Sequence, residues 1–293
     1  MMYKPNPAEL VTNPDGSVYH LKLHRENLAE TVILVGDPGR VPAFSKYFDS
    51  IEFQGSNREI TTHTGRLGSQ RITVLSTGMG TDNIDIVVNE LDALVNIDFS
   101  TREEYPQKTR LKLIRIGTTG SLQPDIPVNS FIRSDYSIGI DTVLNFYTTQ
   151  GCCFEHELAE AFRTQCDWPA SLGIPYAVKA GEDLARHFSD VTVGGVTLTA
   201  PGFYGPQGRR LRLPLAIPDM NERIGRFSFR GLRITNFEME TAALYGLASL
   251  LGHEALTICL AIANRPLGQF NDNYKPRMDE LIRLVLEKIS TLP

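Results

Sequence analysis

The chain has 293 residues, of which 42% are hydrophobic, and a formal net charge of −5 at pH 7. This length and apolar content predict a large core in one domain, spanning residues 1–293, in preference to two fused small ones. No block of basic residues is present, so nucleic acid is not expected as a partner. Because the chain also lacks a membrane-length apolar run and a signal-peptide core, we expect a cytoplasmic protein with a small substrate.

The four cysteines, Cys152, Cys153, Cys166 and Cys259, show no CxxC spacing. In an intracellular chain such a set is expected to be reduced. Cys152, Cys153 and His156 are close enough in sequence to bind a metal, but no second pair of ligands accompanies them. We therefore favour a helix start at this cluster and predict no metal site.

The first half of the chain predicts strands that end in glycine-rich turns. Residues 17–23 alternate as a short strand or arm that carries His20, and residues 31–35 form a strand. The turn at 36–40 then leads into a helix, and its free amides, together with Arg40, suit an anion. The sequence GDPGR is also ordinary turn chemistry and is weak evidence alone.

Residues 71–80 repeat this design, since another buried strand ends in glycines. From residue 82 a helix follows, because its apolar residues recur at helical spacing. Between these elements Arg58 and Glu59 precede a strand, where a solvated ion pair is the plain interpretation. Residues 98–110 are expected to form a polar loop.

The central feature is an apolar strand at 111–116 that opens at 117–120 into a turn rich in glycine and hydroxyl groups. Ligands of open α/β sheets bind beyond the carboxyl ends of strands, so Thr118 and Thr119 are expected to face a polar small molecule. Arg115 is costly to bury alone. It therefore reaches solvent, joins a structural ion pair or meets a bound anion, and we favour the anion. Neither a dinucleotide-binding nor a P-loop motif is present.

The second half predicts a helix at 157–163 and strands at 131–135, 176–180 and 191–200. The loop at 201–213 places Phe203 beside Gln207 and Arg209, which suits a planar polar ligand or a plain exposed loop.

Residues 231–265 read as strand, helix and strand, which indicates a crossover unit of a mainly parallel sheet. Glu238 and Glu240 lie where the first of these strands meets the helix. At least one carboxylate is expected to face the crevice, although acids at a helix start are also stabilised by the helix dipole. A last helix at 277–290 carries an apolar stripe that indicates core packing.

Seven motifs occur in an order that resembles the nucleoside phosphorylase family, and within it the members that act on uridine. They are GDPGR, NREITT, STGMG, RIGTTGSLQP, FYGPQGR, NFEMETA and ANR, between His20 and Arg265. The resemblance implies an α/β fold with one domain, in which helices flank a central mixed, mostly parallel sheet. It also implies a homodimer as the active unit, alone or within a hexamer, that converts uridine and phosphate to uracil and ribose 1-phosphate.

The same resemblance implies roles for individual residues. Phosphate is expected at Gly36, Arg40, Arg58, Arg115 and Thr118, with Arg58 donated across a subunit interface. Ribose is expected at His20, also from the neighbour, and at Thr118, Met239 and Glu240. The base is expected at Thr119, Gly120, Phe203, Gln207, Arg209 and Ile262, with Arg265 behind it. Arg40, Arg115, Arg209 and Glu240 form the expected catalytic set.

Departures from the bacterial family pattern concern assembly and ions. FYGPQGR replaces FYPGQER, and TDN replaces GPS after STGMG. In the bacterial enzymes, the residues after STGMG and the acid that matches Glu59 can hold a potassium ion between subunits, so that ion is left open here. No cofactor is predicted, and phosphate is a co-substrate. Residues 96–110 form an insertion that bears on assembly.

Three other functions compete with this interpretation. Purine phosphorolysis is the nearest, but purine enzymes of this fold present an Asp where this chain has Asn264 and Arg265. A nucleosidase, which uses water, has no need of three phosphate-binding arginines. A non-catalytic nucleoside-binding protein has no need of both the arginines and Glu240.

Overall fold

The computed structural model describes residues 3–149 and 154–292. The strands are β1 (Thr31–Val35), β2 (Ser50–Asn57), β3 (Ile60–Leu67), β4 (Gln70–Ser76), β5 (Ile97–Asp98), β6 (Glu103–Glu104), β7 (Lys112–Ser121), β8 (Phe131–Gly139), β9 (Tyr176–Lys179), β10 (Val193–Thr199), β11 (Ile234–Glu238), β12 (Glu254–Asn264) and β13 (Gln269–Phe270). The α-helices are α1 (Arg40–Ser45), α2 (Thr81–Asn96), α3 (His156–Gln165), α4 (Glu182–His187), α5 (Met220–Arg226), α6 (Thr241–Leu250) and α7 (Lys275–Ser290). Short 3-10 helices span Arg25–Asn27, Val143–Phe146, Ala170–Leu172, Ser189–Val191 and Gly205–Gln207.

The large sheet is mixed, and its centre is parallel. Strands β4, β1, β7 and β12 pair in that order and run parallel. The sheet also closes on itself, because β12 pairs with β8, β8 with β10, β10 with β11, and β11 again with β7. Five strands therefore form a ring, and β7 is both a member of the ring and the strand that joins it to the open part of the sheet.

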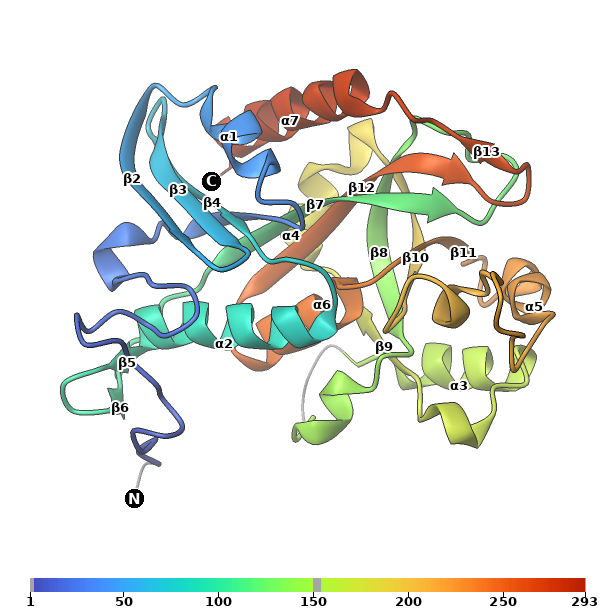
Figure 1. Ribbon diagram of the computed structural model, residues 1–293, viewed down its shortest axis with the longest axis horizontal. Helices are drawn as coiled ribbons and strands as arrows, with labels where there is room; N and C mark the ends of the chain where they lie inside the picture. Colours follow the sequence, from blue (N-terminus) through green and yellow to red (C-terminus); the bar gives the residue numbers. More distant parts are fainter. Residues whose placement is uncertain (1–2, 150–153, 293) are drawn as a thin grey trace.

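Helices cover this sheet on both sides (Figure 1). Helices α2 and α6 lie side by side along one side of β7 and β12, and α1 and α7 lie on the other. Their apolar faces and the central strands form one large buried core, and a smaller core joins α3 and α5 to β8, β10 and β11. The region at the carboxyl ends of β1, β4 and β7, near Arg115 and Glu240, is referred to as the crevice.

Most of the predicted elements are confirmed. The strand at 31–35 has the predicted bounds, and all of its side chains are buried, as expected for a central parallel strand. The stripe on α7, from Met278 to Ile289, is buried against the core. Gly252 follows the end of α6 and has a positive φ of 81°, as is typical of a glycine that stops a helix.

Four predictions differ from the structure, and three of them concern local elements. Residues 17–23 form turns with only an isolated bridge from Val18 to Thr12, because their amides bond locally and to side chains. The predicted turn at 117–120 is part of β7, which continues as it bends to pair with both β12 and β11. Glycines permit such a bend without a side-chain clash. The loop at 98–110 contains the β5–β6 pair.

The predicted parallel crossover is also wrong. Strand β11 pairs antiparallel with β7, whereas β12 pairs parallel with it. Helix α6 therefore connects two strands that lie on different sides of β7 in the ring. The apolar pattern could not reveal this, because it does not record the direction of pairing.

Asp141 anchors the segment that leaves the carboxyl end of β8. It accepts hydrogen bonds from the backbone amide of Val143, at 3.0 Å, and from the hydroxyl of Tyr176, at 2.8 and 2.9 Å to its two oxygens. Burial raises the pKa of Asp141 to about 6, against the lowering effect of these bonds. The carboxyl group is therefore easier to protonate in the folded chain than in the unfolded one.

This difference makes a pH-dependent contribution to stability. Because the folded pKa exceeds the unfolded one, the contribution is fully present below about pH 4 and is lost as the pH rises through about 6. We expect the free energy of unfolding of the wild type, relative to Asp141→Asn, to fall by roughly 2 kcal/mol between pH 4.5 and 7.5. Urea unfolding at the two pH values measures this, and a pH-independent difference would contradict it.

Candidate functional site

Arg115 is the buried cation at the centre of the crevice. Its guanidinium donates to the Glu240 carboxylate, lies 3.3 Å from Glu238 Oε2 and lies 3.5 Å from the Sγ of Cys259. Arg115, Glu238 and Glu240 are all less than 6% exposed. Two carboxylates thus face one guanidinium, and all three groups are almost hidden from solvent.

The charges in this cluster shift one another. Burial alone lowers the pKa of Arg115, but Glu240 and Glu238 outweigh burial, so the net pKa lies above its usual range. Burial raises the pKa of Glu240, and the charge of Glu238 adds to the rise while Arg115 opposes it. The raised pKa of Arg115 and the raised pKa of Glu240 have a common cause. One cation is shared by two acids, so the cluster has an excess of negative charge.

Arg115 also has bonding capacity to spare. Its Nε is buried and finds no hydrogen-bond partner among the residues the structure describes. A buried donor without a partner is costly, so the arrangement is suited to an additional acceptor. The sequence left solvent, an ion pair and a bound anion as alternatives, and the structure excludes solvent and contains the ion pair.

The turn after β1 brings a second arginine to the same place. Arg40 begins α1, and its Nη1 donates to the carbonyl of Ile116 in β7 at 3.2 Å. Burial lowers the pKa of Arg40, with Arg115 among the nearby charges that lower it further. Gly36 lies against the turn after β4, because a Cβ built on it would meet the Gly78 carbonyl at 3.4 Å. Thus the two predicted glycine-rich turns converge beside two guanidinium groups.

The acidic pair at the start of α6 divides into two roles. Glu238 accepts from the amides of Glu240 and Thr241, each at 2.9 Å, and from the hydroxyl of Thr199. It therefore satisfies the helix start, as the dipole interpretation predicted. Glu240 instead accepts from the amide of Gly80 at 2.8 Å, at the beginning of α2. This contact ties the crevice to the turn after β4.

Two more guanidinium groups flank Gly120 at the end of β7. A Cβ on Gly120 would lie 3.3 Å from the Cδ of Arg265 and 3.8 Å from an Nη of Arg209. Burial, and then Arg209, lower the pKa of Arg265 to about 10. The Nη1 of Arg265 is buried and without a hydrogen-bond partner within the described chain. This corner therefore presents one guanidinium donor, the Nη1 of Arg265, that lacks an acceptor.

The loop before α5 shapes the same corner. Arg209 lies over the ring of Phe203, 3.8 Å from its centre, and donates to the Phe203 carbonyl at 2.7 Å and to the side-chain oxygen of Gln207 at 2.5 Å. Gln207 is buried, whereas the Phe203 side chain is half exposed. The loop thus holds an aromatic face beside one amide and one guanidinium group, and their role toward a planar ligand stays a prediction.

Beside this corner lies a cavity of about 600 Å³. Its walls are mainly apolar and include Ile140, Trp168, Leu172, Tyr204, Leu213 and Met220. Arg209 also lines it and lies near Gly120, so this residue is common to the cavity and the corner.

The other predicted ligands on the central elements have mixed surroundings. The Thr119 hydroxyl donates to the Phe237 carbonyl and accepts from the side-chain Nδ2 of Asn236 at 2.9 Å, so it bonds within the sheet and not toward the crevice. Thr118, Met239 and Ile262 are partly exposed. They remain available to a ligand, whereas the Thr119 side chain contributes to holding β7 against β11.

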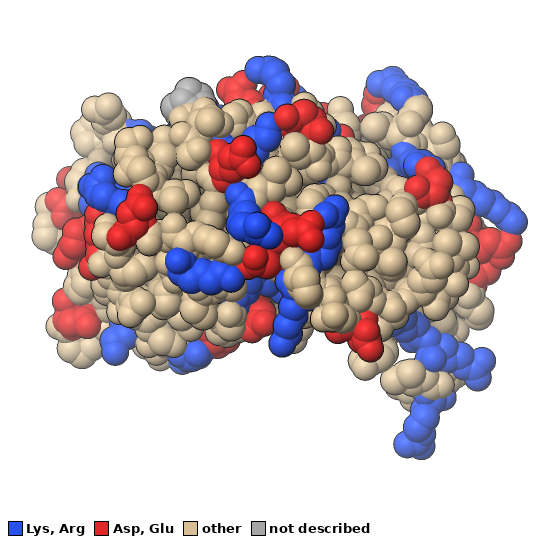
Figure 2. All heavy atoms as spheres, turned by 90° about the horizontal axis from the view of Figure 1, so that it is seen from above, with Lys and Arg blue, Asp and Glu red and all other residues tan. Residues whose placement is uncertain are grey.

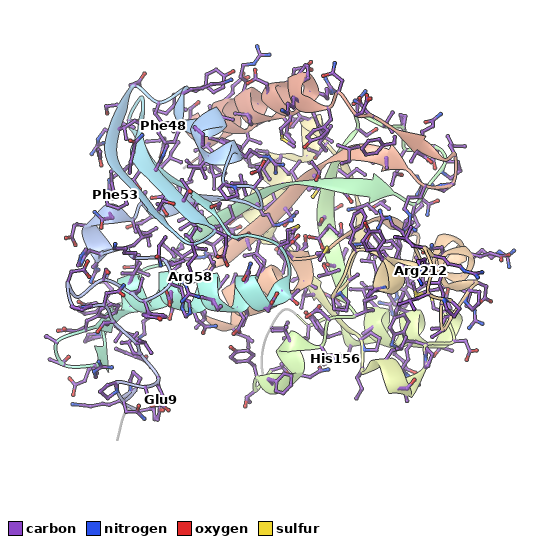
Figure 3. The ribbon with its side chains drawn as sticks, in the orientation of Figure 1. Glu9, Phe48, Phe53, Arg58, His156 and Arg212 are labelled. Carbon is purple, nitrogen blue, oxygen red and sulfur yellow. The ribbon has the colours of Figure 1, made fainter. Side chains whose placement is uncertain are left out.

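The contacts of His20 and Arg58 are with other residues than this cluster. His20 bonds to Glu90 on α2, and Arg58 is at the tip of the β2–β3 hairpin with a φ of 54°. Figure 3 places Arg58 over α2, on the opposite side of the molecule from Arg212 in the loop before α5. Arg58 also stacks over Tyr19, next to His20, at 5.7 Å. The two predicted interface residues are therefore neighbours of each other.

Several functional contacts were not found from the sequence. Cys259 beside Arg115 and Glu90 beside His20 are separated from their partners by 144 and 70 residues, so no local pattern joins them.

Glu59 is exposed at the hairpin tip. Within residues 3–149 and 154–292, no group of three or more His, Cys, Asp or Glu side chains has the geometry of a metal site.

The cysteine-containing segment, for which a helix start and no metal site were predicted, is only partly described by the structure. Cys152 and Cys153 lie outside the described residues, and His156 begins α3, as the helix-start interpretation expected. Cys166 and Cys259 are buried and free.

None of the described helices is long and apolar enough to span a membrane. On the face seen in Figure 2, lysine and arginine side chains are interspersed with aspartate and glutamate.

Comparison with known proteins identifies the family. Residues 30–289 match the family described as the phosphorylase superfamily. The chain is 30% identical over 277 residues to a uridine phosphorylase of Thermococcus kodakarensis, covering 92% of this chain and 86% of that protein. It is also 30% identical over 240 residues to a DeoD-type purine nucleoside phosphorylase of Alkaliphilus metalliredigens, covering 82% and 84%.

A solved structure agrees over nearly the whole chain. The crystal structure of a Trypanosoma brucei nucleoside phosphorylase, described as showing uridine phosphorylase activity, superposes with a TM-score of 0.85 at 29% identity. The match covers 97% of this chain and 100% of that one. The mixed α/β fold is therefore the fold of the family.

The buried cluster makes a direct prediction about stability. Arg115→Met leaves Glu238 and Glu240 without their cation, so we expect the free energy of unfolding to fall by about 3–5 kcal/mol. Adding Glu240→Gln is expected to recover part of the loss, because one buried charge is removed. Chemical denaturation measures both variants.

Arg233→Met is a matched control, since it breaks an exposed pair with Asp125. We expect a change of less than about 1 kcal/mol there. Equal losses for the Arg115 and Arg233 variants would show that burial of the cluster contributes nothing.

Proposed function

The chain belongs to the phosphorylase superfamily, and from this premise we propose that it is a uridine phosphorylase. The reaction converts uridine and phosphate to uracil and ribose 1-phosphate. The observation that carries the proposal is the convergence of Arg40 and Arg115 with Glu240 on one side of the crevice, and of Arg209 and Arg265 on the other. The first group suits an anion and a sugar, and the second suits a base with carbonyl oxygens.

In this proposal phosphate occupies the corner formed by Arg40 and Arg115. Forked guanidinium donors match phosphate oxygens, and a clamped dianion approaches the sugar from a fixed direction. The amides of the turn at Gly36 and the hydroxyl of Thr118 add donors. Phosphate also competes with Glu240 for Arg115, so its arrival frees the Glu240 carboxylate to accept bonds from ribose hydroxyls.

The chemical step forms one bond and breaks another. A phosphate oxygen attacks C1′ of the ribose while the bond from C1′ to N1 of uracil breaks, and the electron pair leaves with the base. The ribose gains positive charge in this transition state. Phosphate and Glu240 lie where they stabilise that charge, and Met239 packs beside the sugar.

The departing base carries the negative charge. A pyrimidine has no N7 to be protonated, so its developing anion spreads onto the carbonyl oxygens. Gln207, Arg209 and Arg265 supply donors for them, while Phe203 stacks on the ring and Gly120 and Ile262 line it. A proton from solvent completes uracil at N1.

Purine phosphorolysis is the second candidate because purine enzymes are among the relatives. The side chain at position 264 argues against it. Asn264 is buried, and its amide donates to the carbonyls of Gln123 and Ile126, at 3.0 and 2.9 Å. It thus supplies no carboxyl group for a purine base. A nucleosidase or a passive nucleoside-binding protein is disfavoured because neither requires the paired arginines.

His20 and Arg58 are assigned to the site of a second copy of the chain. The proposed active unit is therefore a homodimer or a larger assembly built from it. An alkali ion near Glu59 is not part of the proposal, and neither is any cofactor.

The first test measures uracil release from uridine with phosphate present and with phosphate rigorously removed. We expect release only with phosphate, because the arginines bind it as the nucleophile. Inosine serves as the purine control. Equal release without phosphate would indicate hydrolysis, and cleavage of inosine alone would overturn the assignment of Gln207, Arg209 and Arg265.

A second test concerns the role of Glu240. In Glu240→Gln we expect kcat/KM for uridine to fall by roughly 100-fold, because a charged acceptor of ribose hydroxyls is lost. The loss is expected to be smaller for 2′-deoxyuridine, which lacks one of these hydroxyls. An equal loss for both substrates would mean that Glu240 acts only through Arg115.

A further inference from the structure

We propose that Glu90 is a positioning residue that fixes the place and the tautomer of His20. The proposal rests on the function proposed above, in which His20 contacts the ribose of a second copy. Glu90 lies in the third turn of α2, 70 residues from His20 in sequence. It touches no substrate, and it acts through the imidazole.

The first observation is that one carboxylate receives three donors from the His20 segment. Glu90 Oε2 accepts from the amides of His20 and Leu21, at 3.0 and 2.9 Å. Glu90 Oε1 lies 2.6 Å from the Nδ1 of His20. The carboxylate therefore binds both the backbone and the ring of the same residue.

The second observation is that Glu90 is the acceptor for the amides of His20 and Leu21, whereas the rest of the segment is held by its own turns and by core packing of Val18 and Leu23. Residues 17–23 form turns and belong to no strand, so their amides lack a sheet ladder. Asn57 adds one contact, because its amide donates to the His20 carbonyl at 2.8 Å. The Glu90 side chain is 15% exposed and that of His20 is 32% exposed. The carboxylate is thus shielded, while the ring keeps an edge open to a partner.

The third step concerns the proton on the ring. An ionised carboxylate can only accept hydrogen bonds, so the Nδ1 of His20 must carry the hydrogen. In the neutral imidazole the Nε2 is then an acceptor. An acceptor at Nε2 suits a hydroxyl group that donates, and the ribose 5′-hydroxyl of uridine is such a group. Glu90 thereby selects the useful tautomer.

The fourth step concerns which ribose is served. Gly80, at the start of α2, donates to Glu240 of the same chain. Ten residues of helix separate Gly80 from Glu90, which is about 15 Å along the axis. Glu90 is thus well separated along the helix from the contact with Glu240, in keeping with the assignment of His20 to a second copy in the proposed function. Helix α2 thus contacts Glu240 of its own site through Gly80 at its start, and it positions His20 for another site through Glu90 in its third turn.

The test begins with the tautomer, which is measured without substrate. Protein labelled with ¹⁵N in its histidines gives ring nitrogen signals that distinguish Nδ1–H from Nε2–H, and the spectrum of His20→Gln assigns the signal of His20. At a pH where the ring is neutral, we expect the Nδ1–H form in the wild type. In Glu90→Gln the amide donates to Nδ1, so the Nε2–H form is expected to dominate.

Asp85→Asn is the matched control, because it removes one negative charge from the same helix. Asp85 accepts from the hydroxyl of Tyr147 and does not contact His20. We expect the His20 signal to be unchanged in this variant. An unchanged tautomer in Glu90→Gln would overturn the proposal.

The second readout compares uridine with 5′-deoxyuridine in the presence of phosphate. We expect Glu90→Gln to reduce the ratio of their kcat/KM values by about tenfold, toward that of His20→Gln, since a hydrogen bond to the 5′-hydroxyl is lost. Activity on 5′-deoxyuridine itself is expected to change less than twofold. Equal losses on both substrates would assign Glu90 a merely structural role and overturn the proposal.

Glu90→Asp separates tautomer from placement and covers the case in which Glu90→Gln fails to fold. It keeps an acceptor but shortens the side chain, so we expect the Nδ1–H form with a reduced substrate ratio. An unreduced ratio would overturn positioning by Glu90. Failure of the proposed function has a different signature, because the wild type would then release no uracil while the tautomer result would still decide the link from Glu90 to His20.

Discussion

The structure depends on a guanidinium buried between two carboxylates. Arg115 lies in the strand that belongs to both the closed ring and the open sheet, and Glu238 and Glu240 reach it from the start of α6. A buried ion pair of this kind contributes little net stability compared with apolar packing, but the loss of either partner is costly. The cluster therefore specifies one arrangement of β7, β11 and α6 more than it strengthens the fold.

The same cluster explains how a stable core can also be a binding site. Arg115 is only partly satisfied in it, because its Nε has no partner among the described residues, and the same holds for Nη1 of Arg265 beside Gly120. Such groups are costly in the free protein and become satisfied when a ligand with acceptor oxygens arrives. The proposed substrates, an anion and a base with carbonyl groups, are ligands of this kind.

Local patterns in the sequence predicted elements well where one face or both faces of an element are buried. The strand at 31–35 and the helix at the end of the chain are examples, because their apolar residues recur at the spacing of the element. The glycine-rich turns and Arg40, Arg115 and Glu240 were also predicted as one group, and the structure brings them together. Their roles toward a ligand stay predictions.

What could not be predicted depends on contacts between distant parts of the chain. The bend of β7 at residues 117–120 depends on pairing with two other strands, and the turns at 17–23 depend on a carboxylate in α2. Pairing direction between β11 and β7 leaves no trace in apolar periodicity. These features are set by tertiary geometry, which a local reading of residue types does not contain.

The distance along the chain between Arg115 and its acidic partners has a consequence for biosynthesis. The Glu240 that pairs with Arg115 follows it by 125 residues. On the ribosome, β7 therefore emerges long before the acids that neutralise its central cation. If β7 were buried before those acids were available, the Arg115 charge would be left unpaired in apolar surroundings, which is costly. We thus expect β7 to remain incompletely packed in the N-terminal half until Glu240, in the last third of the chain, has been translated.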